Sequence, residues 1–135
     1  MELQERLATV LDEVMSIQRE DDGALTVRHD QTIASLRVVT IAEGLDMVSL
    51  TQILAWDLPV DAKIRNNVAR HARNTLLGTV SLAEKSAGAK GNSKKAGDVL
   101  LRYNFPAAGL ADDALRTLIL LVLGTGADIR RDLIG

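Results

Sequence analysis

The feature that most constrains the fold is a run of six apolar residues near the C-terminus, Leu118 to Leu123. It follows Asp112, a residue type that caps helix N-termini, so the run predicts a helix that is apolar around its whole circumference. A surface helix is normally apolar on one side only. Either the rest of the domain encloses this helix or a second subunit covers part of it, and the sequence leaves both alternatives open. Gly124 and Gly126 predict an end or a kink, because each costs about 1 kcal/mol inside a helix.

The length of the chain predicts a single domain over residues 1–135, large enough to bury its own core. The aromatic residues are Trp56, Tyr103 and Phe105, so the core is expected to be built from aliphatic side chains. The absence of cysteine excludes disulfides, thiolate metal sites and cysteine nucleophiles. The N-terminus does not resemble a signal peptide, and no stretch approaches the ~20 apolar residues of a membrane span. We therefore expect a cytoplasmic protein without membrane contact.

Apolar spacing along the chain predicts an α+β domain. Spacings of three and four predict a helix from about residue 3 to 18, and a regular four-residue spacing predicts a second helix over 60–76. Stretches that are rich in β-branched residues or have a two-residue apolar period predict strands at 24–28, 32–42, 48–58, 79–84 and 98–105. The predicted order is α-β-β-β-α-β-β-α, with helices packed on one face of a five-stranded antiparallel sheet. Residues 85–96, rich in Gly, Ser, Ala and Lys, predict a flexible loop.

Sequence signatures of catalysis and of metal or cofactor binding are not found. The loop string GAKGNSKK lacks the residue order of a phosphate-binding loop, and His29 and His71 have no ligand partner at helical or strand spacing. Asp57 and Asp61 flank Pro59 and could bring two carboxylates together, although capping of the second helix is the favoured role of Asp61. We therefore expect no enzyme, no catalytic residues, no metal and no cofactor.

Two strings carry a resemblance to a known family: AWDLPV (Ala55 to Val60) and LLRYNFP (Leu100 to Pro106). With the leucine-rich helix after Asp112, they resemble the YbjN-domain family, which is described as secretion-chaperone-like or as proposed sensory transduction regulators. The predicted element order also resembles that of class I type III secretion chaperones. The resemblance implies a non-enzymatic, chaperone-like or regulatory module that forms a homodimer and binds an extended segment of a client protein.

Two sets of residues follow from this hypothesis. The third predicted strand supplies the candidate partner-binding residues Val48, Leu50, Leu54 and Trp56. The resemblance implies that the second helix supplies the dimer interface, which gives Ile64, Val68 and Leu76. The alternative is a regulator that acts through nucleic acid or a small ligand, by way of the basic helix 60–76 and the loop 85–95. A net charge of −2 and the scarcity of aromatic residues weigh against nucleic acid.

Overall fold

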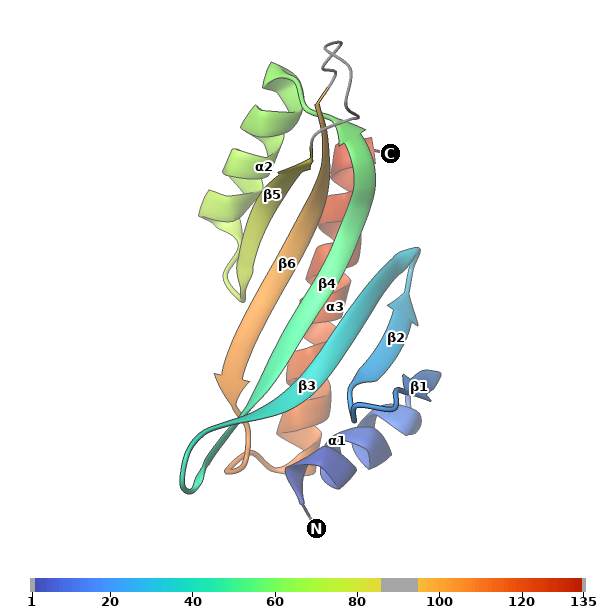
Figure 1. Ribbon diagram of the computed structural model, residues 1–135, viewed down its shortest axis with the longest axis vertical. Coiled ribbons are helices and arrows are strands. Elements are labelled where there is room, and N and C mark those ends of the chain that lie inside the picture. Colours follow the sequence, from blue (N-terminus) through green and yellow to red (C-terminus); the bar gives the residue numbers. More distant parts are fainter. Residues whose placement is uncertain (1, 86–94, 135) are drawn as a thin grey trace.

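A computed structural model describes residues 2–85 and 95–134 of the chain (Figure 1). The predicted flexible loop therefore lies mostly outside the described residues. The described part contains three helices and six strands, namely α1 (Leu3–Asp12), β1 (Ile17–Arg19), β2 (Leu25–His29), β3 (Thr32–Ala42), β4 (Leu45–Pro59), α2 (Ala62–Asn74), β5 (Thr79–Lys85), β6 (Ala96–Pro106) and α3 (Asp112–Ile134). No helix in this part is long and apolar enough to cross a membrane.

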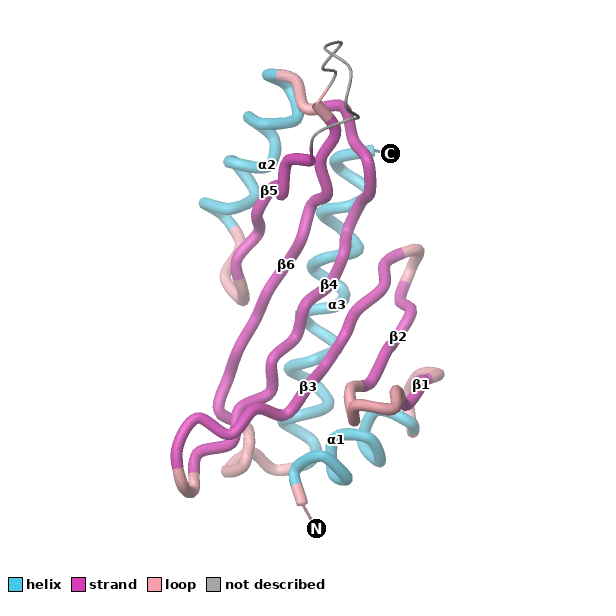
Figure 2. Tube along the Cα trace, viewed as in Figure 1, coloured by secondary structure: helices cyan, strands magenta, loops and turns pink. Residues whose placement is uncertain are grey.

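All six strands form one antiparallel sheet in the order β1-β2-β3-β4-β6-β5 (Figure 2). The α+β class and the antiparallel sheet are confirmed, but the prediction of five strands is wrong. The additional strand, β1, has three residues and pairs with β2 through Ile17 and Val27. Its Ile17 continues the three- and four-residue apolar spacing of α1, so sequence periodicity assigned it to the helix. The helix in fact ends at Asp12.

The helices lie on one side of the sheet (Figure 1). Helix α3 packs against β2, β3 and β4, α1 packs against α3 and the start of the sheet, and α2 packs on β5 and touches α3. The core between sheet and helices is almost entirely aliphatic, and its largest fully buried side chains include Leu7, Leu36, Leu50, Leu101 and Leu123. Among residues 2–85 and 95–134, no helix covers the other side of the sheet.

Helix α3 continues through both of its glycines as one helix, so the expectation that it ends there is wrong. Gly126 is buried directly against the side chain of Gln52 on β4, where a Cβ atom would overlap with the amide group. A helix can therefore pass close to the sheet at this point only if the residue is glycine. The helix is enclosed on most of its circumference by its own domain, while Leu121 remains 57% exposed.

Candidate functional site: an open sheet face and a free strand edge

On the side of the sheet opposite the helices, no helix of the described chain covers the strands (Figure 1). We call this side the open face. Strand register places its side chains in four rows across β3, β4 and β6, namely Ile33–Ile53–Leu100, Ser35–Thr51–Arg102, Arg37–Ser49–Asn104 and Val39–Met47–Pro106. The first and last rows are apolar, and the two middle rows are polar. Side chains of all four rows are half-buried or exposed.

Further apolar side chains extend both ends of the open face. Val39 is 40% exposed, and beyond it the β3–β4 hairpin carries Ile41 and Leu45, which are 58% and 41% exposed. This hairpin projects from the body of the domain (Figure 1). At the opposite end of β4, Trp56 is 44% exposed. Exposed apolar groups of this number on adjoining strands are typical of a contact surface.

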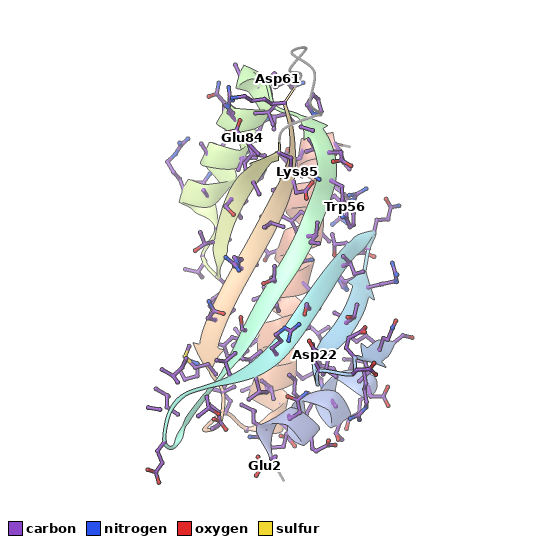
Figure 3. All side chains as sticks on the ribbon, viewed as in Figure 1. Glu2, Asp22, Trp56, Asp61, Glu84 and Lys85 are labelled. Carbon is purple, nitrogen blue, oxygen red and sulfur yellow. The ribbon has the colours of Figure 1, made fainter. Side chains whose placement is uncertain are left out.

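The predicted partner-binding residues divide between the two faces. Val48, Leu50 and Leu54 are 0% exposed and belong to the core beneath α3, so their prediction as an exposed contact face is wrong. Trp56 instead points away from the core, because the β4–β6 register shifts between Ile53 and Ala55. The shift buries Leu54 and Ala55 together, and the alternation of β4 is then reversed for Trp56. The position of Trp56 beside β4 can be followed in Figure 3.

A second candidate surface is the edge of β3. Asp30 and Gln31 form a two-residue hairpin turn with positive φ angles of 44° and 67°, and His29 pairs with Thr32 across it. The residues that flank such a turn are a hydrogen-bonded pair, and such pairs recur at every second position along an antiparallel ladder. The backbone groups of even-numbered β3 residues therefore point toward β2.

Pairing between β2 and β3 ends at Leu25 and Leu36, whereas β3 continues to Ala42. By the same alternation, the N–H and C=O groups of Val38 and Thr40 point to a side where no strand of the described chain pairs with them. Beside this free edge lies a hollow of about 340 Å³, lined by Gln4, Asp22, Gly23, Ala24, Arg37, Val38, Val39 and Thr40. A free ladder next to a hollow can accept an extended peptide.

Charged groups at the end of this hollow are already organised. Asp22 forms an ion pair with Arg37 at 2.8 Å and accepts a hydrogen bond from the backbone N–H of Ala24 at 3.1 Å. The hydrogen bond from Ala24 and the guanidinium of Arg37 lower the pKa of Asp22. A second hollow of about 460 Å³ continues past this pair and is lined by Glu20, Asp21 and neighbouring residues. The surroundings of the β3 edge are therefore rich in carboxylates.

The predicted dimer residues on α2 also divide. Ile64 and Val68 are 8% and 6% exposed and pack into the core of their own chain. The four-residue apolar spacing of α2 thus marks the face that covers β5, and these two side chains are not available to a partner. Leu76 lies beyond the end of α2 and is 92% exposed. Whether the chain forms a dimer stays a prediction.

Asp57 and Asp61 do not come together as a carboxylate pair. Asp61 caps α2, with its carboxylate accepting a hydrogen bond from the backbone N–H of Ile64 at 2.8 Å. Asp57 has a positive φ of 52° and shares the ammonium group of Lys85 with Asp98, at 2.7 and 2.8 Å. The hydrogen bonds that the Lys85 ammonium group donates to Asp57 and Asp98 raise the pKa of Lys85, and Lys85 lowers the pKa of Asp98. Lys85 thus lies between the carboxylates of Asp57 and Asp98.

No group of three metal-ligating side chains is found among the described residues. His71 instead joins α2 to α3, with its Nε2 atom 2.6 Å from Asp132, which also pairs with Arg70 at 2.8 Å. His71 and Arg70 lower the pKa of Asp132. A further pair joins Arg65 to Glu84 at 2.8 Å. Two of the basic residues of α2 are therefore neutralised within the chain.

No family model and no curated protein sequence matches the chain. Among solved structures, the crystal structure of YbjN from E. coli, described as a putative transcription regulator, matches with a TM-score of 0.66 at 12% sequence identity. The match covers 93% of this chain and 86% of the YbjN chain. The chain has a YbjN-like fold.

The sequence did not reveal the open face or the free edge, because both depend on register. Arg102 lies beside Thr51 only through the β4–β6 pairing, and the two residues are far apart in sequence. For the open face, the available sequence signal was the alternation within β4, where Ser49, Thr51 and Ile53 fall on the side opposite to the predicted contact residues. For the free edge, the available signal was that the predicted strand corresponding to β3 is longer than the one corresponding to β2.

Proposed function

We propose that this chain is a regulatory protein-interaction module that binds an extended segment of a partner protein along the free edge of β3. The observation that carries the proposal is the unpaired ladder at Val38 and Thr40 beside a hollow. A YbjN-like fold, and the description of YbjN as a putative transcription regulator, support the regulatory part of the proposal. The proposal needs no catalytic group, metal or cofactor.

The bound segment would continue the line of β2. Its backbone would exchange hydrogen bonds with the N–H and C=O groups of Val38 and Thr40, which provide affinity that is independent of sequence. Alternate side chains of the segment would point into the hollow beside Gln4 and toward the open face beside Val39. The carboxylates of Glu20 and Asp21 in the adjoining hollow favour basic side chains in the segment.

The test is affinity capture of partners with the wild-type chain and with Val38→Pro. Proline removes the N–H group that points to the free edge but leaves the β3–β4 ladder, as edge positions permit. A matched control is Lys63→Glu, on the exposed surface of α2. We expect a partner that the wild type and the control retain and that Val38→Pro loses, together with slower amide exchange of residues 38–40 in the purified complex. Equal capture by Val38→Pro, with circular dichroism showing a folded chain, would refute binding at this edge.

A second candidate is a regulator that binds nucleic acid through α2. It is supported by the exposed bases Lys63 and Arg73, which form no ion pair within the described residues, and by the description of YbjN. Binding of a random DNA duplex should then be measurable at 50 mM salt and fall steeply by 200 mM, because displaced counterions drive it. It should also weaken in Lys63→Glu. Absence of binding at 50 mM salt would remove this candidate.

A further inference from the structure

On the open face, polar and apolar side chains follow the same order in both directions along β4 from the level of Leu50. Along β4, the outward residues on one side of Leu50 are Ser49, Met47 and Leu45, and on the other side they are Thr51, Ile53 and Trp56. Each series begins with a hydroxyl and continues with two apolar side chains. The strands next to β4 follow the same order, since the outer rows are apolar and the inner rows polar on β3 and β6 as well.

We propose that the open face is the interface of a homodimer, in which a two-fold axis lies between the two stacked sheets, perpendicular to the strands and level with Leu50 of β4. An isologous interface brings one patch against itself, so the patch has to be self-complementary. The axis places the apolar row of Ile53 on the apolar row of Met47 of the other copy, and the reverse. The two sheets would stack about 10 Å apart, as in sheet-on-sheet packing.

The charged side chains of the open face are compatible with this two-fold axis. Arg102 lies on β6 in the row of Thr51, and the axis places it against the row that contains Asn104 on β6 of the other copy. Arg37 lies on β3 in the row of Ser49 and comes to oppose Ser35. Each guanidinium therefore meets an uncharged hydrogen-bond acceptor, and Arg37 brings its own counter-ion in Asp22. Like charges do not oppose each other across the axis.

The projecting hairpin supports the same orientation. In each copy β3 begins at Thr32, so the end of β4 that carries Trp56 has no β3 residue beside it. The proposed axis lays the hairpin residues Ile41 and Leu45 of one copy over this end of the other. The exposed apolar side chains at both ends of the face are then covered together.

The size of the face is sufficient for association. From Leu45 to Trp56 it extends about 36 Å at about 3.3 Å per residue, and three strands at about 4.8 Å give a width of about 15 Å with side chains. The projected area of about 500 Å² is smaller than the accessible area of its pleated side chains, which brings it near the ~800 Å² per partner of a standard interface. The middle rows are polar, which is typical of a dimer that dissociates at low concentration.

The test is sedimentation velocity of the full chain between 1 and 200 μM, for the wild type and three variants. We expect Ile53→Lys and Met47→Lys to raise the dimer dissociation constant at least tenfold each. The control Leu121→Lys changes an equally apolar exposed residue on α3 and should leave the constant unchanged. Thermal melts followed by circular dichroism verify that each variant is folded, and two variants at opposite ends of the face guard against the failure of one.

The orientation is tested separately by cysteine crosslinking, for which the cysteine-free chain is a clean background. In the double variant Ile53→Cys/Met47→Cys, oxidation should join position 53 of one copy to position 47 of the other. A wild-type chain that remains monomeric at 200 μM, or a dimer that neither lysine variant weakens, would overturn the proposal. Crosslinks only between identical positions would overturn the axis. Val38→Pro lies outside the four rows and should not affect dimerisation, so this proposal and the partner-binding proposal fail independently.

Discussion

The two faces of the sheet are made by the same strands, yet they differ in almost every physical property. On the covered face, Leu36, Leu50, Leu54 and Leu101 are fully buried in the core between the sheet and the helices. On the open face, the residues between them are hydroxyls, arginines and half-buried aliphatic side chains. The covered face holds the fold together, while the open face is free to contact other molecules. The alternation of a strand thus allows one sequence to carry two separate sets of constraints.

The largest expected effect separates the two faces directly. Leu50→Ala should lower the free energy of unfolding by about 2–5 kcal/mol, because it leaves a cavity in the core. Its neighbour Thr51→Ala, on the open face, should change it by less than about 0.5 kcal/mol. Urea unfolding at one protein concentration measures both. Equal losses in the two variants would mean that packing does not distinguish the faces.

The next effect concerns the closest approach of α3 to the covered face. Gly126→Ala should destabilise the protein by about 1–3 kcal/mol, because its Cβ would overlap with Gln52. Gly124→Ala, two residues away, meets nothing within 4 Å and should stabilise the helix by up to about 1 kcal/mol. Thermal or urea unfolding of the pair provides the measurement. Stabilisation by both substitutions would show that α3 can move away from the sheet without lowering the free energy of unfolding.

A smaller effect is expected from the polar side chain within the covered face. Gln52 donates hydrogen bonds from Nε2 to Thr32 Oγ1 at 2.9 Å and to Leu123 O at 3.1 Å, while its Oε1 atom has no partner in the described chain. A buried carbonyl oxygen without a partner costs about 1–3 kcal/mol. We therefore expect Gln52→Met to stabilise the protein by up to about 1 kcal/mol in urea unfolding.

The Gln52→Met substitution leaves no new orphan group, because Thr32 keeps its hydrogen bond to His29 O at 2.5 Å and the carbonyl of Leu123 lies within a continuous helix. Thr51→Val on the open face serves as the matched control for removing a polar group from β4. If Gln52→Met instead lowers the free energy of unfolding by more than about 1 kcal/mol, the two hydrogen bonds of the amide stabilise the protein by more than its unpaired oxygen destabilises it.

The smallest effect is a dependence on pH at the end of the open face. The pKa of Asp98 is lowered by Lys85 and by the backbone N–H of Asp57. A depressed folded-state pKa contributes stability that is present above the unfolded value near 3.9 and is lost as the pH falls through the folded value. We expect the melting temperature of the wild type to fall more steeply below pH 4 than that of Asp98→Asn. Parallel pH profiles would contradict a role for this carboxylate.

Sequence patterns predicted the element types well and the faces poorly. Of the elements in the described part of the chain, the three helices and five of the six strands could be predicted from apolar periodicity, because each is long enough to show its own period. Strand β1 could not, since three residues do not establish a period and Ile17 continued that of α1. The direction of Trp56 was also hidden, because a register shift in β4 has no local sequence signal.

The candidate site depended on information that no single segment contains. The apolar stripe of α2 has the same appearance whether Ile64 and Val68 face their own sheet or a second subunit, and only the position of β5 decides between the two. The free edge of β3 likewise follows from the relative lengths of two paired strands. Burial and pairing between distant segments determine which apolar residues are left for partners.

The strand order has a consequence for how the chain reaches this structure. Strand β6 lies between β4 and β5, so the β5–β6 hairpin joins the sheet through a single long-range pairing that brings Met47 opposite Pro106. Until that hairpin arrives, β4 is an edge strand with apolar side chains on both of its faces. Such a segment is a template for intermolecular pairing, and pairing between distant segments is slow. The chain is therefore most vulnerable to aggregation during synthesis, in the interval between release of β4 from the ribosome and completion of β6.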